Sequence, residues 1–186
     1  SVLACANERI ITHISNFRKV KNIPDVVKVF YNVQKEVPSK LMMVGEGPEK
    51  EIAEKLCEDL GISDKVIFFG NSNDINQILK YSDLFLLPSE TESFGLAALE
   101  AMAFNVPVIS SNSGGIPEVN EEGISGFLSN VGDVESMSQN AITILKSDDT
   151  LNQFKKSAFE VAKKFDIKNI LPLYEDLYNK AINLES

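Results

Sequence analysis

Short, continuous runs of apolar residues alternate along this chain with longer stretches whose apolar residues recur every three or four positions. Apolar runs without polar alternation are typical of strands that are buried on both faces of a parallel sheet. Strands that alternate with helices through right-handed crossovers form a doubly wound sandwich. The chain is therefore predicted to have an α/β fold, a doubly wound parallel sheet of about six strands with helices on both faces. We expect strands at residues 9–15, 40–44, 66–69, 84–87, 106–110 and 126–128, and helices at residues 24–37, 49–60, 75–81, 94–104, 134–146, 151–164 and 173–182.

Composition excludes several classes of protein. The 186 residues are 44% hydrophobic and 24% charged, which is ordinary for one globular domain. There is no apolar run of about 18 residues, so we expect no integral membrane segment, and we expect no secretory signal. The formal net charge of −9 gives no general attraction for nucleic acid or anionic membranes. Cys5 and Cys57 form no disulfide framework, so the cytoplasm is the simplest localisation.

The loops that follow the strands are where a ligand would bind, because a doubly wound sheet binds ligands beyond the carboxyl ends of its strands. The most informative loop and helix occupy residues 88–103 (PSETESFGLAALEAMA). That helix is apolar on almost every side but carries Glu100, and a buried carboxylate is costly without a partner. Glu100 is therefore expected either to face a cleft and bind hydroxyl groups, to cap a neighbouring backbone, or to be an exposed helix carboxylate.

The start of the same helix is a candidate anion site. Unpaired backbone N–H groups at a helix start bind anions, and Gly95 would remove a Cβ that keeps a phosphate away. The alternative is that Ser89 and Glu92 form a capping box with no ligand. The N–H groups in question belong to Phe94, Gly95 and Leu96.

Glu92 and Glu100, separated by seven residues, resemble the E-x7-E signature of retaining glycosyltransferases of the GT-B fold, family four. Further resemblance lies in residues 45–48 (GEGP), 66–70 (VIFFG), 114–118 (GGIPE) and 123–128 (GISGFL). The resemblance covers nearly the whole chain and implies that residues 1–186 form the Rossmann-like, donor-binding C-terminal half of a GT-B enzyme. It also implies that helices within residues 167–184 return toward an N-terminal acceptor domain that this sequence lacks, and that this half alone is inactive.

The first loop, residues 13–21 (HISNFRKVK), is similar to that of family members that make N-acetylglucosaminyl-L-malate in bacillithiol synthesis. Many relatives place Gly-Arg-x4-Lys-Gly there, and on alignment at Lys21 the glycine and arginine positions hold Ser15 and Asn16. Arg18 is the candidate that replaces the missing cation. The alternative is that this basic cluster is a solvated loop.

The resemblance implies a role for each matching residue. It implies a UDP-sugar donor and an acceptor, suspected to be L-malate, that the missing half mainly binds. No cofactor is expected, and because the chain contains no Asp-x-Asp, cations and N–H dipoles would stabilise the leaving diphosphate without a metal. The implied catalytic residues are Glu92, Lys21 and Arg18. The implied donor-binding residues are Ser15, Asn16, Gly45, Gly47, Asn71, Ser72, Phe94, Gly95, Leu96 and Glu100.

Other interpretations remain open at this point. The same fold could serve another UDP- or GDP-sugar-dependent enzyme that acts on a lipid or polysaccharide acceptor, a sugar-nucleotide epimerase, or a nucleotide-binding module without chemistry. His13, the one histidine, is either a general base or, as we expect at a strand end, a structural hydrogen-bonding group.

Overall fold

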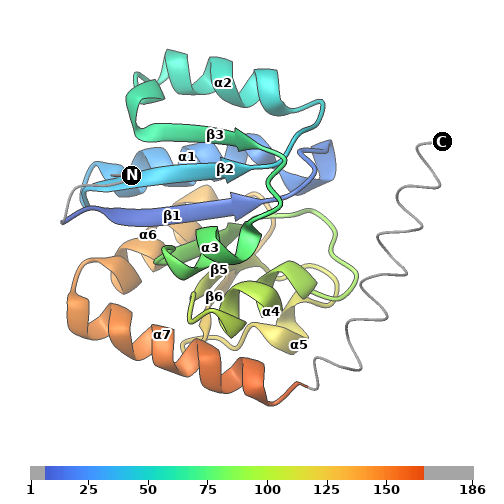
Figure 1. Ribbon diagram of the computed structural model, residues 1–186, viewed down its shortest axis with the longest axis vertical. Helices are drawn as coiled ribbons and strands as arrows, with labels where there is room; N and C mark the ends of the chain where they lie inside the picture. The colour runs from blue at the N-terminus through green and yellow to red at the C-terminus, as the bar shows by residue number, and fades with distance from the viewer. Residues whose placement is uncertain (1–6, 166–186) are drawn as a thin grey trace.

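A computed structural model describes residues 7–165. Within them six parallel strands form one sheet in the order β3-β2-β1-β4-β5-β6, as predicted. The sheet, drawn in Figure 1, comprises β1 (Arg9–Ile14), β2 (Ser39–Val44), β3 (Val66–Gly70), β4 (Leu84–Leu87), β5 (Val108–Ser111) and β6 (Gly126–Ser129). Cys5 and the expected helices within 167–184 lie outside the described residues.

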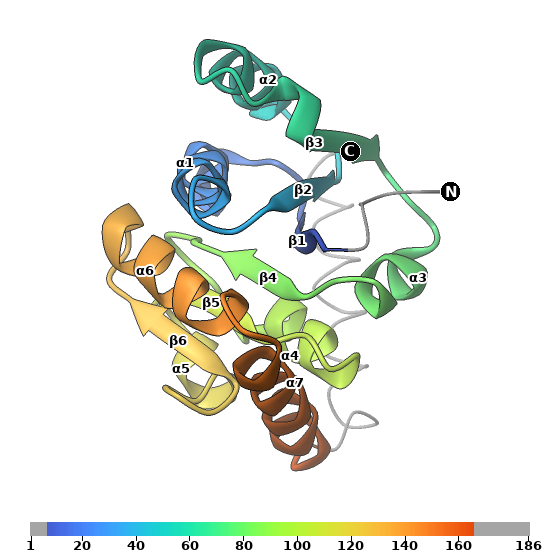
Figure 2. The same ribbon diagram turned by 90° about the vertical axis from the view of Figure 1, so that its left-hand side faces the viewer.

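Helices cover both faces of the sheet, as Figure 2 shows edge-on. One apolar core lies between the sheet and α1, α2 and α6, and a second lies between the sheet and α3, α4 and α5. The last described helix, α7, contributes to both cores. The helices are α1 (Ile23–Gln34), α2 (Lys50–Asp59), α3 (Ile75–Lys80), α4 (Leu96–Ala103), α5 (Ile116–Val119), α6 (Val134–Leu145) and α7 (Asp148–Lys163).

Local chemistry explains where the observed elements differ from the predicted ones. The helix expected from residue 94 begins at Leu96, because Gly95 takes a left-handed conformation with φ of 65°. The helix expected from residue 151 begins at Asp148, because the Ser147 side chain accepts a hydrogen bond from the Thr150 N–H and caps it. Helix α5 and the 3₁₀ turns Lys19–Lys21 and Ser63–Lys65 were not predicted, because single turns carry no periodic signal.

The strand order places the site. The chain runs outward from β1 through β2 to β3 and then returns to β4 on the other side of β1. The loops after β1 and β4 therefore diverge and leave a crevice at the carboxyl edge, which is where ligands bind in this architecture.

Candidate functional site

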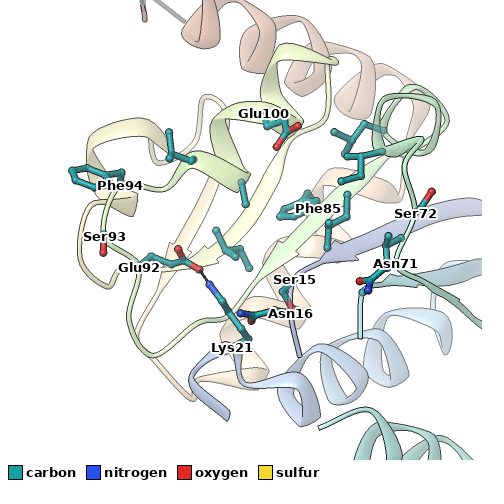
Figure 3. A pocket seen from close by; sticks show the side chains of 18 of the residues that line it. Ser15, Asn16, Lys21, Asn71, Ser72, Phe85, Glu92, Ser93, Phe94 and Glu100 are labelled. Atoms are coloured by element: carbon teal, nitrogen blue, oxygen red, sulfur yellow. Dashed lines mark hydrogen bonds and ion pairs between the residues drawn. The ribbon is translucent and has the colours of Figure 1, made fainter. Parts of the chain in front are cut away.

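A cavity of about 730 Å³, here called the main cavity, lies at the carboxyl ends of β1 and β4. Figure 3 shows its lining, with Lys21 and Glu92 meeting on one side and Glu100 reaching in from α4. The structure thus gathers most of the predicted site residues around one space. The predicted residues that line it are Ser15, Asn16, Lys21, Gly45, Asn71, Ser72, Glu92, Phe94, Leu96 and Glu100.

A smaller hollow of about 350 Å³, here called the side cavity, adjoins the main cavity and shares Asn16, Lys21, Glu92 and Ser93 with it. Arg18 lines the side cavity and is absent from the lining of the main cavity. The two predicted cations of the first loop therefore differ in position: Lys21 faces both spaces and Arg18 faces one.

Gly47 and Gly95 are not among the residues that line the main cavity, and the structure shows a packing reason for glycine at both positions. A Cβ on Gly47 would lie 2.0 Å from the Asn16 carbonyl oxygen, so this glycine lets the first loop pack against the loop after β2. A Cβ on Gly95 would lie 2.7 Å from the Val119 side chain. Neighbouring protein therefore fills the Cβ positions of both glycines, and the donor-binding roles implied for Gly47 and Gly95 stay predictions.

Lys21 and Glu92 form the central ion pair of the site. The Lys21 Nζ lies 2.7 Å from Glu92 Oε1, with the two side chains 23% and 13% exposed. The Ser89 hydroxyl donates to the same carboxylate oxygen at 3.0 Å. The pair of Ser89 and Glu92 is not a capping box, because the helix begins four residues beyond Glu92. Glu92 is instead fixed by one hydroxyl and one ammonium at the wall between the two cavities.

The loop that carries Glu92 is held from behind by the loop between β5 and α5. The Ser111 and Ser113 hydroxyls both donate to the Ser89 carbonyl, at 2.6 and 3.0 Å. The Gly115 N–H donates to the Glu92 carbonyl at 2.9 Å. A Cβ on Gly114 would lie 1.7 Å from that same carbonyl oxygen, so the two loops touch backbone to backbone. This support fixes Glu92 through its main chain as well as its side chain.

Glu100 projects from the first two turns of α4 into the main cavity. Burial raises the pKa of its carboxyl group. Among residues 7–165 no hydrogen bond or ion pair reaches that carboxylate. Its position supports the cleft-facing alternative over the exposed one, and a partly buried carboxylate without a protein partner is suited to accept hydrogen bonds from a ligand's hydroxyl groups.

His13 is a structural residue, as expected. Its ring is fully buried and stacks between Phe17 and Phe85, while Nδ1 and Nε2 lie 2.8 Å from the Leu86 carbonyl and the Ser15 hydroxyl. Burial lowers the pKa of His13 to about 4, so the ring is neutral at pH 7. A neutral ring that donates to the carbonyl must accept from Ser15, which orients that hydroxyl at the cavity floor.

Sequence reasoning missed part of the lining. Ser93 and Asn73 adjoin residues that were predicted, and their polar character beside Glu92 and Asn71 was the available signal. The apolar wall could not be found in the same way, because a cavity-facing apolar residue and a core residue look alike in sequence. That wall includes Ile14, Ile75, Leu79, Phe85 and Leu87.

Residues 7–165 contain no group of three or more His, Cys, Asp or Glu side chains placed to hold a metal ion. In that same part of the chain, none of the helices has the length and apolar character needed to span a membrane.

Comparison with known proteins identifies the family. Residues 3–161 match the family model described as glycosyl transferases group 1. The chain belongs to this family. N-acetyl-alpha-D-glucosaminyl L-malate synthase of Bacillus anthracis is 44% identical over 173 residues, which cover 92% of this glycosyl transferase chain and 45% of that protein. Sulfoquinovosyl transferase SQD2 of Arabidopsis thaliana is 31% identical over 84% of the chain and 30% of its own length. The chain thus spans less than half of each of these two relatives.

Solved structures confirm the GT-B glycosyltransferase architecture. S. aureus TarM, crystallised as a variant with UDP and alpha-GlcNAc-glycerol among its ligands, matches with a TM-score of 0.81 and 25% identity over 93% of this glycosyl transferase chain and 36% of TarM. Anabaena HepE in complex with UDP and glucose matches with a TM-score of 0.79 and 25% identity over 94% of the chain and 49% of HepE. The predicted family and fold are therefore confirmed.

Proposed function

We propose that this chain is the donor-binding half of a retaining glycosyltransferase that transfers N-acetylglucosamine from UDP-N-acetylglucosamine to L-malate. The observation that carries the proposal is the 44% identity to a synthase named for that product, over 92% of the chain. That span includes the loops of the main cavity. The wider group of relatives supports the donor nucleotide, since the TarM and HepE structures contain UDP.

The residues of the main cavity suit the parts of such a donor. Departure of UDP leaves about two negative charges on the diphosphate, and Lys21 and the start of α4 are placed to stabilise them. Glu100 accepts hydrogen bonds from the ribose hydroxyls, and Glu92 accepts them from the sugar. The polar loop after β3, with Asn71 and Ser72, also lines the main cavity and would contact the base.

Retention of configuration is part of the proposal. The Glu92 carboxylate is already engaged by Lys21 and Ser89, which suits a residue that binds and orients and does not suit an attacking group. The acceptor hydroxyl would therefore attack the face from which the diphosphate leaves. We nominate no protein nucleophile, and we expect no metal requirement, because Lys21 and backbone dipoles supply the positive charge.

The acceptor and the location complete the proposal. The relatives are about twice as long as the matched region or longer, so the acceptor would be bound mainly by a second half, and this half alone would not turn over. The free thiol of buried Cys57 supports a reducing compartment, the cytoplasm.

Calorimetric titration of the chain with nucleotides tests the donor site. UDP and UDP-N-acetylglucosamine should both bind with EDTA present, whereas GDP should bind at least tenfold more weakly. No heat at millimolar UDP, from a chain that is folded by circular dichroism, would remove the proposal. The enzyme that joins this half to an acceptor half should then glycosylate L-malate in preference to lipid or polysaccharide acceptors. Nucleotide binding without any transfer would favour a non-catalytic module.

A further inference from the structure

The two partners of the central ion pair come from separate segments of the chain. Lys21 ends the 3₁₀ turn Lys19–Lys21, here called the Lys21 turn, and Glu92 lies 71 positions later, in the loop between β4 and α4. Figure 3 shows the two side chains meeting from these segments. A lysine side chain is long and flexible, so the 2.7 Å contact with Glu92 depends on how the Lys21 turn is held against that loop.

Two hydrogen bonds join the Lys21 turn to the loop between β4 and α4. The Glu90 N–H donates to the Val20 carbonyl at 2.8 Å, and the Asn22 side-chain amide donates to the Pro88 carbonyl at 3.0 Å. Val20 and Asn22 are the chain neighbours of Lys21, so the Lys21 backbone is tied to the loop on both sides. The first bond joins two main chains and does not depend on the side chains present, whereas the second requires the amide of Asn22.

Asn22 has no other role at the start of α1. It is the residue that precedes the helix, where the side chain of an asparagine commonly accepts a hydrogen bond from a backbone N–H. The Asn22 side chain makes no such capping bond, and its φ of 52° is left-handed, whereas a capping residue is typically extended. Asparagine suits this position because it tolerates a left-handed backbone and also carries a hydrogen-bond donor.

We infer that Asn22 is a positioning residue, which holds Lys21 beside Glu92 by tying the Lys21 turn to the loop between β4 and α4. The inference deepens the proposed function and rests on it for the identity of the ligand. A donor diphosphate attracts the Lys21 ammonium, and a turn that is tied at both neighbours of Lys21 resists being pulled out of place. The turn is also ordered before the donor arrives, so less conformational freedom is lost on binding.

Asn22→Gly tests this role, because glycine adopts the same left-handed conformation and lacks the amide. Asn105→Gly is the matched control, since Asn105 has a φ of 63°, is exposed and lines neither cavity. In calorimetric titrations of the chain, Asn22→Gly should bind UDP about fivefold more weakly than the wild type, as expected for one lost hydrogen bond. Asn105→Gly should bind UDP within about twofold of the wild type.

Amide hydrogen exchange measures the contact without any nucleotide. The Glu90 N–H reaches across to the Val20 carbonyl, so its exchange with solvent reports how often the Lys21 turn and the loop separate. Exchange at Glu90 should be about fivefold faster in Asn22→Gly, and it should be unchanged in Asn105→Gly.

A double-mutant cycle separates positioning from a general loss of structure. Because Asn22 acts through Lys21, Asn22→Gly should change UDP affinity by less than about twofold in the Lys21→Gln background. The inference is overturned by an equal loss in both backgrounds, by a loss in Asn105→Gly as large as in Asn22→Gly, or by an unchanged Glu90 exchange rate in Asn22→Gly. Failure of the wild type to bind UDP would instead remove the proposed function, and the exchange at Glu90 would still test the contact.

Discussion

Replacement of Glu92 by glutamine is expected to tighten the binding of UDP. The Glu92 carboxylate holds the Lys21 ammonium at 2.7 Å, so a diphosphate that contacts Lys21 also approaches a negative charge. An ammonium nitrogen that contacts both groups places their oxygens about 4–5 Å apart. Removal of the carboxylate charge therefore removes a repulsion at short range.

The magnitude follows from the exposure of the pair. Two unit charges at 4 Å repel by about 1 kcal/mol in bulk water and by about 4 kcal/mol at the effective dielectric constant near a protein surface. Lys21 and Glu92 are 23% and 13% exposed, which places the repulsion between these limits. Loss of the ion pair also loosens Lys21, which opposes the gain. We expect a net gain of about 1 kcal/mol, or about fivefold tighter UDP binding.

Calorimetry with UDP and with UDP-N-acetylglucosamine measures this effect. The UDP-sugar should not share the gain, because in the proposed function Glu92 binds the sugar, so the preference for UDP-sugar over UDP should fall. Glu90→Gln is the matched control, since Glu90 is an exposed carboxylate on the same loop, and it should change UDP affinity by less than twofold. Weaker UDP binding by Glu92→Gln would refute the reasoning and show that Glu92 acts by positioning Lys21. An equal gain in Glu90→Gln would attribute the effect to net charge.

Three further predictions follow from the hydrogen bonds and the burial of the site. Glu100→Gln should weaken UDP binding by about 1 kcal/mol through lost charge-assisted hydrogen bonds. Because burial raises the pKa of Glu100, the stability of the wild type falls as pH rises through the carboxyl range. The variant should therefore melt at a higher temperature than the wild type at pH 7 but not at pH 3. Ser89→Ala should weaken UDP-sugar binding by about 1 kcal/mol, measured by calorimetry. Ser138→Ala, at a buried serine remote from the site, is the control and should change only the melting temperature. The NMR titration of His13 should have its midpoint near pH 4. Because the unfolded chain binds a proton at His13 near pH 6.5 and the folded chain does not, about 3 kcal/mol of unfolding free energy should be lost as pH falls from 6.5 through 4. His13→Gln should lack this pH dependence of stability.

Much of the fold could be predicted because its signals are local. Continuous apolar runs identified all six strands, and amphipathic periodicity identified the longer helices. Helix α5 was missed, since four residues cannot display a helical period. The start of α4 was misplaced by two residues, because a left-handed glycine ends the preceding loop and no periodic pattern records backbone conformation.

The candidate site was predictable where chemistry is unusual for its surroundings. Glu100 is a charge on an apolar helix, and Lys21 lies in a basic cluster of an acidic chain, so both were identifiable. The reason for glycine at positions 47 and 95 was not identifiable from the sequence. Only the structure reveals that Asn16 and Val119 occupy the space that a Cβ on Gly47 or Gly95 would need. The position of Arg18, which lines the side cavity and not the main cavity, was equally hidden, because no sequence pattern records the left-handed backbone of the preceding residue, Phe17.

Unfavourable local features are concentrated at the carboxyl edge of the sheet. Phe17 holds a left-handed conformation, which costs of order 1–3 kcal/mol, and Glu100 is partly buried without a protein partner among the described residues. The core beneath them has no comparable conflict, since no buried side-chain nitrogen or oxygen in the described part of the chain lacks a hydrogen-bond partner. Backbone conformation alone would favour glycine at position 17, and packing alone would favour an apolar residue at position 100. A sequence that violates local rules at one edge, and satisfies them elsewhere, is the pattern expected where ligand binding offsets the cost.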